Sequence, residues 1–333
     1  MSGPDETPFD EFDWIEQDLQ PLAGAAAEAL GLKDDAAVIP GRPGFDLVVS
    51  KDAIVAGVHF LPDDPPDLVA RKLLRVNLSD LAAKGAEPYG YFLAVAWPNG
   101  TGRETRRLFA EGLRRDQAEF GLTLMGGDTV STPGPLTASV TVLGWAPAGS
   151  MIRRAGGRAG DRLLVSGTIG DGGLGLRAAQ GGLAESPGDD IAWLADRYRT
   201  PQPRLGLGEA LRAFAHASAD VSDGLIADAG RIAAASGLGL RIDLARMPVS
   251  PPATRWLADR PDPIAGLRDL ATAGDDYEVV CAVAPDRVAG FTIAAQAVGP
   301  PFTEVGVLTE DAGVRVFHGA VEVRMDRLGY RHG

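Results

Sequence analysis

The chain has 333 residues, which exceeds one ordinary compact domain and favours two. Its formal net charge of −13 opposes binding to the phosphate backbone of nucleic acids or to anionic membranes, because both require concentrated positive charge. A polyphosphate ligand would therefore need help from metal ions or arginine side chains.

Cysteine usage and the N-terminal sequence indicate the cellular compartment of the protein. Cys281 is the only cysteine, which excludes an intrachain disulfide and a multi-cysteine zinc site, and we expect it to pack in the core. Residues 1–14 are acidic and lack the basic stretch and apolar run of a secretory signal, and no window is long and apolar enough to span a bilayer. We expect a cytoplasmic protein with no membrane partner.

The first half of the chain mixes helical and strand patterns. Apolar residues at helical spacing over residues 10–30 predict an amphipathic helix, interrupted near Pro21. Short apolar segments follow at residues 36–39 and 47–49, and both run into acidic residues. The periodicity then predicts helices at 67–84 and 104–120 and strands at 91–97 and 137–143.

The glycine-rich segment 146–160 separates this pattern from a second one, so we predict domains at 1–148 and 149–333. The second pattern predicts strands at 162–166, 238–242 and 277–283, with helices at 174–180, 205–216 and 225–236. Because helices and strands do not follow a strict βαβ rhythm, the fold class is mixed α/β in two domains rather than a doubly wound sheet.

Five acidic clusters lie where predicted strands end or predicted helices begin: Asp34-Asp35, Asp52, Ser79-Asp80, Gly126-Gly127-Asp128 and Asp220-Val221-Ser222-Asp223-Gly224. Such aspartates commonly serve as helix caps and turn formers. Magnesium prefers oxygen ligands and usually takes one or two carboxylates plus phosphate oxygens. Several separate carboxylates therefore also suit several ions that bridge a polyphosphate.

Two of the clusters favour a functional interpretation. Asp128 follows a glycine pair that permits close approach of a ligand to the backbone, and Asp80 lies inside a helical pattern with Asn77 on the same face. The sequence has no G-x-x-x-x-G-K-[ST] loop, so phosphate binding must use another cradle. The loop GDGGLG at 170–175 does not meet the dinucleotide spacing and is equally consistent with a tight turn into a helix.

The ordered motifs KDDAAVI, SKDAIVAGVHF, NLSDLAAKGAEP, MGGDT, RRAGGRAGD, SGTIGD, DVSDGLIAD and GDDYE resemble those of the thiamine-monophosphate kinase family over roughly Trp14 to Tyr330. That family belongs with aminoimidazole ribonucleotide synthetase and selenophosphate synthetase. The resemblance implies a two-domain aminoimidazole ribonucleotide synthetase-like fold whose N-terminal sheets pair in a homodimer. It also implies a kinase that makes thiamine diphosphate from thiamine monophosphate and ATP with Mg²⁺.

The resemblance also assigns roles to individual residues. It implies metal ligands, direct or through water, at Asp35, Ser50, Asp52, Asp80, Asp128, Asp220 and Asp223. Of these, Asp80, Asp128 and Asp223 are the predicted catalytic residues. ATP contacts are implied at Gly127, Asp128, Arg154 and Ser222, and contacts to thiamine monophosphate at His59 and Asp275.

Taken without the resemblance, His59 is better explained as a capping or packing residue at a strand end, and Arg153 and Arg154 are equally consistent with solvated side chains. The chain departs from the family at Lys33, Lys51, Asp275 and Arg327, which puts local metal and substrate contacts in doubt. Lys51 has two interpretations: it points away from Ser50 and Asp52, with its head in water, or the strand ends before it and its ammonium turns toward Asp35 or Asp80.

Two rival functions stay open on the sequence. One is another ATP-using enzyme of the same superfamily, although the position of Cys281 in an apolar strand speaks against selenide chemistry. The other is a non-catalytic nucleotide-binding protein, against which the retained aspartates argue. A phosphate monoester acceptor is largely deprotonated near neutral pH, so a kinase of this kind needs no general base. This explains how a site rich in aspartate can transfer phosphate.

Overall fold

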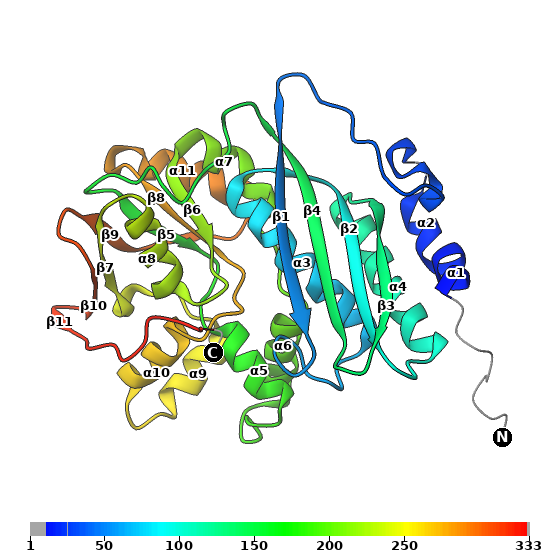
Figure 1. Ribbon diagram of the computed structural model, residues 1–333. Helices are drawn as coiled ribbons and strands as arrows, with labels where there is room; N and C mark the ends of the chain where they lie inside the picture. Colours follow the sequence, from blue (N-terminus) through cyan, green and yellow to red (C-terminus); the bar gives the residue numbers. More distant parts are fainter. Residues whose placement is uncertain (1–10, 25, 332–333) are drawn as a thin grey trace. The chain divides into compact units, whose positions relative to one another are not determined.

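The computed structural model describes residues 11–24 and 26–331, which form two compact units (Figure 1). The first unit comprises the described residues up to Asn77 together with Pro88–Trp145. The second comprises Leu78–Glu87 and everything from Ala146 onward. Helix α3 (Pro66–Lys84) therefore begins in one unit and ends in the other. The sequential boundary predicted after residue 148 stays a prediction.

The first unit is built on a four-stranded sheet with the order β1-β4-β2-β3. Its strands are β1 (Phe45–Val55), β2 (Glu87–Pro98), β3 (Leu124–Thr132) and β4 (Thr137–Pro147). Helices α3 and α4 (Arg103–Phe120) lie along one face of this sheet (Figure 1). The strands predicted at 91–97 and 137–143 and the helices predicted at 67–84 and 104–120 are confirmed.

Helix α4 shows why its sequence signal was clear. Phe109, Ala110 and Leu113 form a buried stripe at helical spacing. Gly121 takes a left-handed conformation, with φ of 69°, and its amide closes the helix on Gln117. The buried carboxylate of Asp116 accepts a hydrogen bond of 2.6 Å from the Arg75 guanidinium, which joins α4 to α3.

The N-terminal segment is helical but irregular. Helix α1 (Glu11–Trp14) runs into a π-helical turn at Ile15–Leu19 and then into α2 (Gln20–Ala23). This widened turn is the interruption that the sequence predicts near Pro21. It arises because Pro21 has no amide hydrogen to donate to the preceding turn. A 3₁₀ segment, Ala27–Leu32, follows. Residues 10 and 25 of the predicted helix lie outside the described part of the chain.

The second unit contains a seven-stranded mixed sheet with the order β11-β10-β7-β9-β5-β8-β6. The strands are β5 (Arg162–Ser166), β6 (Ala215–Asp220), β7 (Gly239–Asp243), β8 (Val279–Val283), β9 (Phe302–Thr309), β10 (Val314–His318) and β11 (Val321–Glu322). Strand β10 is parallel to β7, whereas β5 is antiparallel to both of its neighbours. The mixed sheet agrees with the predicted fold class.

The helices of the second unit are α5 (Asp171–Ala179), α6 (Gly188–Arg199), α7 (Gly208–Phe214), α8 (Leu225–Ala235), α9 (Pro251–Ala258), α10 (Pro263–Ala271) and α11 (Val288–Gln296). Short 3₁₀ turns occur at Leu205–Leu207, Leu244–Arg246 and Pro285–Arg287. Helices α6, α9, α10 and α11 and strands β9 to β11 had no counterpart in the sequence prediction.

Two predicted boundaries in the second unit were wrong. The helix predicted at 205–216 ends at Phe214, because Ala215 begins β6. The strand predicted at 277–283 begins only at Val279, since Tyr277 takes a left-handed conformation with φ of 52°. Such a backbone cannot continue a strand.

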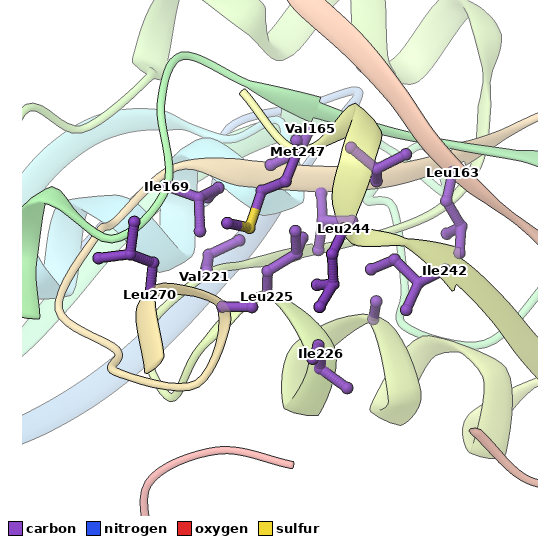
Figure 2. Close-up of a cluster of buried hydrophobic side chains, with 14 of the residues drawn as sticks. Leu163, Val165, Ile169, Val221, Leu225, Ile226, Ile242, Leu244, Met247 and Leu270 are labelled. Atoms are coloured by element: carbon purple, nitrogen blue, oxygen red, sulfur yellow. The ribbon is translucent and has the colours of Figure 1, made fainter. Parts of the chain in front are cut away.

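The central strands of the second unit are buried on both faces. Leu163, Val165, Val280 and Ala282 belong to one hydrophobic cluster, part of which Figure 2 shows between α8 and the turn at Leu244. The intervening Leu164 and Cys281 belong to a second cluster on the opposite face. Cys281 is fully buried, as expected, and burial raises the pKa of its thiol.

In the part of the chain that the structure describes, no helix has both the length and the apolar character needed to cross a bilayer.

Candidate functional site

The Gly-Gly-Asp motif of the first unit lies on β3, which runs parallel to β2 and sets Asp128 opposite Ala94. A Cβ added to Gly127 would lie 1.8 Å from the carbonyl oxygen of Leu93, on β2. The glycine is therefore required by the close approach of two strands. This corrects our interpretation of the pair as room for a ligand, although an ATP contact at Gly127 stays a prediction.

Asp128 lies beside a cavity of about 320 Å³ within the first unit. Asp34 and Asp35 border the same cavity from the chain that follows the 3₁₀ segment, and Asp35 and Asp128 are both exposed. The structure thus brings together two predicted metal ligands that are far apart in the sequence. The remaining walls are largely apolar, with Ile15, Leu19, Phe92, Leu93 and Met125 among them.

Ser50 and Asp52 lie on β1, with Ser50 half-buried and Asp52 exposed. The amide of Asp52 donates a 2.8 Å hydrogen bond to Oδ1 of Asn77, and Nδ2 of this buried side chain donates to the carbonyl oxygen of Leu73. Asn77 therefore fixes the position of β1 against α3.

His59 follows the end of β1 and is half-buried. Its Nδ1 accepts a 3.1 Å hydrogen bond from the amide of Val55, so the neutral ring carries its proton on Nε2. The carbonyl oxygen of His59 accepts from Nζ of Lys72 at 2.9 Å. The ring thus caps a strand end, as in the structural alternative, and its contact with thiamine monophosphate stays a prediction.

Lys51 binds hydroxyl groups of the neighbouring strand β4. Strand β1 continues through it to Val55, so the hypothesis that the strand ends before Lys51 is wrong. The ammonium donates to Oγ of Ser139 at 2.7 Å and reaches Oγ1 of Thr141 at 3.5 Å, both on β4. Hydroxyl partners on the neighbouring strand hold it on the sheet face away from Ser50 and Asp52.

In the second unit, Asp220 ends β6 and is buried, while Asp80 lies on α3. Burial raises the pKa of Asp220 well above its ordinary value, and the negative charges of Asp80 and Asp228 raise it further. Lys84 and the hydroxyl of Ser79 oppose this shift. The structure therefore gathers Asp80 and Asp220, two predicted metal ligands, into one acidic cluster.

The loop after β6 is held by α8. The buried carboxylate of Asp228 accepts hydrogen bonds from the amides of Ser222, at 3.0 Å, and Asp223, at 2.9 Å. Arg231 pairs with the carboxylates of both Asp223 and Asp228. Asp223, a predicted metal ligand and catalytic residue, is thus ion-paired with arginine, and Ser222 is half-buried beside it.

A second segment, 274–278, runs along this loop. The amides of Asp275 and Tyr277 donate to the carbonyl oxygens of Ser222 and Val221, at 2.9 and 2.8 Å. Asp275 and Tyr277 are half-buried and both have positive φ, of 61° and 52°. Left-handed backbone at non-glycine residues is uncommon and often marks functional sites. The Tyr277 hydroxyl donates to Oδ1 of Asp275 at 3.1 Å.

The alternate residues of this segment anchor it in the core. Asp276 is buried, and its carboxylate accepts hydrogen bonds from the amides of Gly170 and Gly172 at 2.9 and 3.0 Å. Glu278 is buried as well and binds the hydroxyl of Ser166 at 2.6 Å. Burial raises the pKa of Asp276 well above its ordinary value.

This anchoring explains the glycine-rich loop at 170–175. Its amides at the start of α5 bind the carboxylate of Asp276, which occupies the place that a phosphate would take in a phosphate-binding loop. A Cβ at Gly172 would lie 2.2 Å from the carbonyl oxygen of Asp275. The loop is therefore the tight turn that the sequence left as an alternative.

Arg154 is exposed, and its positive charge adds to the effect of burial in lowering the pKa of Lys84 to about 8. The side chain therefore lies near the cluster of Asp80 and Asp220 within the second unit. This position is compatible with a phosphate contact, because a guanidinium can donate two parallel hydrogen bonds to an anion. The contact itself stays a prediction.

The predicted metal ligands fit Mg²⁺ by their donor chemistry. Among residues 11–24 and 26–331, no group of three or more histidine, cysteine, aspartate or glutamate side chains has the geometry of a metal site. Mg²⁺, however, usually takes one or two carboxylates and completes its shell with water and phosphate oxygens. The pairs Asp35 with Asp128 and Asp80 with Asp220 each supply such oxygens.

Several residues that organise the site were missed from the sequence. Lys84, Asp228, Asp276 and Glu278 are all charged and lie within a few residues of predicted site positions. The signal available for Lys84 was its spacing of four from Asp80, which puts both on one helix face. For Asp276 and Glu278 it was the alternation of acidic residues through GDDYE.

The two halves of the chain match two family models. Residues 33–146 match the AIR synthase related protein, N-terminal domain, and residues 158–319 match the AIR synthase related protein, C-terminal domain. The chain is therefore an AIR synthase-related protein with both characteristic domains. This agrees with the mixed two-unit fold described above.

Sequence similarity over the whole chain identifies one family among the AIR synthase-related proteins. The chain is 53% identical to thiamine-monophosphate kinase of Caulobacter vibrioides over 332 residues, which cover 100% of this chain and 93% of that protein. The chain belongs to the thiamine-monophosphate kinase family, as the sequence motifs predicted.

Two solved structures support this assignment. The crystal structure of thiamine-monophosphate kinase from Stenotrophomonas maltophilia K279a is 36% identical, with a TM-score of 0.80, and the match covers 92% of this chain and 96% of that one. A structure described as AaThiL complexed with AMPPCP and TMP is 26% identical, with a TM-score of 0.77, over 88% and 89% of the two chains.

Proposed function

We propose that the protein phosphorylates thiamine monophosphate with ATP to give thiamine diphosphate and ADP. The observation that carries this proposal is the 53% identity to a thiamine-monophosphate kinase over the full chain. The neighbouring structure with AMPPCP and TMP supports the pair of substrates, an ATP analogue and the monophosphate. The predicted site residues lie in motifs of this family.

The reaction is an in-line transfer between two phosphates. A terminal oxygen of thiamine monophosphate attacks the γ-phosphorus of ATP, and the bond from that phosphorus to the β–γ bridging oxygen breaks. ADP leaves with the electron pair of the broken bond. Because the acceptor oxygen is largely deprotonated near neutral pH, the protein has to orient and neutralise the two polyanions, and no base is needed.

Mg²⁺, when bound, would neutralise charge on the phosphates and help to align them. Asp35, Ser50, Asp52 and Asp128 of the first unit and Asp80, Asp220 and Asp223 of the second are its proposed ligands, direct or through water. Arg154, Ser222 and Gly127 are the proposed ATP contacts. His59 and Asp275 are the proposed contacts to thiamine monophosphate.

The cavity beside Asp128 is the proposed nucleotide-binding pocket. Its volume of about 320 Å³ lies at the lower end of the range of small-molecule sites, and its walls are mainly apolar. Thr129 lines the cavity, and its buried hydroxyl has no hydrogen-bond partner among the described residues.

The decisive assay measures ADP release and thiamine diphosphate formation with ATP, thiamine monophosphate and Mg²⁺. We expect stoichiometric formation of both products that depends on the monophosphate. ATP binding without turnover would support the non-catalytic alternative. Turnover only with a different acceptor would support another enzyme of the superfamily.

We also propose a homodimer. A homodimer that pairs its N-terminal sheets cannot do so through the edges of β2 and β4, because both are interior strands with neighbours on both sides. Contact would therefore use the sheet face opposite α3 and α4, where Leu47 and Val49 are 39% and 54% exposed. A cytoplasmic location stays a prediction from the sequence.

A further inference from the structure

The loop that carries Arg154, residues 153–161, has the sequence RRAGGRAGD and contains neither helix nor strand. Most of it is exposed, and its alanine and glycine residues offer little that could pack against a core. Such a stretch does not keep one conformation by itself, because glycine loses much backbone entropy when it is ordered. Contacts with the rest of the unit must therefore hold Arg154 in place.

Asp161 closes this loop directly before β5. Its side chain is 2% exposed, and Oδ2 accepts a 2.8 Å hydrogen bond from the amide of Arg158. The same oxygen lies 2.9 Å from Nδ1 of His216, on β6. Because a carboxylate can only accept, Nδ1 carries the proton and donates it in this bond. The end of the loop is thus tied both to itself and to β6.

His216 lies in a β-bulge of β6. Strands β5 and β6 both run antiparallel to β8, which lies between them, so both begin at the same edge of the sheet. The partners of Ala215 and Ala217 on β8 are consecutive residues, so His216 between them opposes no residue of that strand. Bulges redirect a side chain and are common next to active sites. This one allows the ring of His216 to bind Asp161 at the edge where the loop crosses.

The same stretch of β6 also holds the first half of the loop. The amide of Ser218 donates a 3.0 Å hydrogen bond to the carbonyl oxygen of Arg153. Gly156 has a φ of 121°, and a Cβ there would lie 2.6 Å from the carbonyl oxygen of His216. Arg154 lies between these two contacts in the sequence. Its backbone is therefore fixed on both sides by the strand that carries the bulge.

We propose that Asp161 and His216 are positioning residues that hold the loop 153–161 so that Arg154 meets a phosphate group of ATP. Both act through Arg154 and not by contact with a substrate. A guanidinium binds phosphate best through two parallel hydrogen bonds, so a small displacement of its backbone weakens the contact. The inference rests on the proposed function only in taking Arg154 as an ATP contact, and it is independent of the acceptor.

The test measures the Kd for ATP by isothermal titration calorimetry, together with the KM for each substrate. In His216→Leu the ring nitrogen is lost, and we expect the Kd and KM for ATP to rise about five- to tenfold while the KM for thiamine monophosphate stays nearly unchanged. His216→Asn places an amide nitrogen at about the position of Nδ1 and should stay near the wild-type affinity. His216→Gln, whose amide corresponds to Nε2, should behave like the leucine variant and replaces it if that variant does not fold.

Arg154→Met shows whether the pair acts through Arg154. We expect this variant alone to weaken ATP binding at least as much as His216→Leu does. Adding His216→Leu to Arg154→Met should then weaken it little further, because the side chain that the pair positions is already gone. If His216→Leu weakens ATP binding by the same factor in both backgrounds, the proposal is overturned. An unchanged Kd for ATP in Arg154→Met would overturn it as well.

His318→Leu is the matched control, because His318 is also a half-buried histidine of a strand in the same unit, at the end of β10. We expect it to leave the Kd for ATP unchanged. If His216→Leu lowers the Tm but leaves the Kd for ATP unchanged, the pair is only structural and the inference is wrong. A wild-type protein that shows the expected ATP-binding pattern but does not phosphorylate thiamine monophosphate would refute the proposed function alone.

Discussion

Asp128 combines an exposed carboxylate with a position beside the apolar cavity of the first unit. We expect Asp128→Asn to reduce kcat/KM at least about tenfold, because a charged oxygen ligand is lost from a site and not from the core. Circular dichroism and Tm should stay near the wild-type values. Asp63→Asn, at an exposed carboxylate, is the control. Near-normal turnover of Asp128→Asn at limiting Mg²⁺ would disprove the role.

Tyr277 acts on the neighbouring residue Asp275. Since its hydroxyl donates to Oδ1 of Asp275 at 3.1 Å, Tyr277→Phe should leave that carboxylate less well oriented. We expect KM for thiamine monophosphate to rise several-fold, with kcat and the KM for ATP nearly unchanged. Steady-state kinetics with each substrate varied will check this. In the Asp275→Asn background, adding Tyr277→Phe should change the KM for thiamine monophosphate very little. If the two substitutions change KM independently of each other, the coupling is refuted.

Asp276 provides a pH-dependent test of the segment 274–278. Burial raises the pKa of its carboxyl, Asp171 adds to the shift, and the amides of Gly170 and Gly172 and the charge of Arg197 oppose it. Between the ordinary and the raised pKa, the folded state keeps a proton that the unfolded state has lost. The wild-type protein therefore loses this part of its stability as pH rises through that range.

Asn at position 276 cannot ionise, and its NH₂ group would stand where one of the two carboxyl oxygens now faces the amide of Gly170. We expect Asp276→Asn to cost about 1–3 kcal/mol of unfolding free energy. The cost should be larger at pH 5 than at pH 8, because the wild-type protein alone weakens over that interval. Urea unfolding at both pH values measures it. A cost that grows with pH would show that the carboxylate is stabilised in its ionised form.

The pairing of β2 with β3 depends on the absence of a side chain at Gly127. In Gly127→Ala the Cβ would lie 1.8 Å from the carbonyl oxygen of Leu93, so the two strands must separate. We expect a loss of about 2–4 kcal/mol in unfolding free energy, as for other severe overpacking. Gly188→Ala is the control, because a Cβ there meets nothing within 4 Å and the residue opens α6. Equal stability of the two variants would contradict this account.

Elements with strong local signals were predictable from the sequence. Helix α4 has a buried apolar stripe and a glycine at its C-terminal end, and β5 is a short apolar run at the predicted residues Arg162–Ser166. Helices α9 and α10, of 8 and 9 residues, are too short for their periodicity to stand out. The left-handed backbone at Asp275 and Tyr277 could not be predicted, because it results from buried carboxylates that bind distant parts of the chain.

The candidate site was likewise only partly predictable from the sequence. Motifs identified which aspartates matter, but the partners of those aspartates are set by tertiary contacts. Asn77 binds the amide of Asp52 across 25 residues, and Lys84 binds the carbonyl oxygen of Ser218 across 134. Contacts between residues so far apart in the sequence leave no local sequence pattern. The same limit explains why the direction of Lys51 was left open.

At the scale of the whole molecule, the exposed face of β1 allows the homodimer to be tested. We expect light scattering at micromolar concentration to give twice the chain mass, and Val49→Glu to shift the protein toward the monomer by placing a charge in the contact. Val321→Glu, at a residue 69% exposed on β11, is the control. A monomer mass for the wild-type protein would contradict the proposal.

Helix α3 also affects the order in which the chain folds during its synthesis. Residues 78–87 leave the ribosome long before strands β5 to β11, yet the unit to which they belong is complete only after those strands have been made. Ala83 and Ile152 belong to the same buried cluster as Phe302. A nascent chain therefore carries this stretch without its packing partners until those strands are made, so its apolar residues are open to a chaperone during that interval.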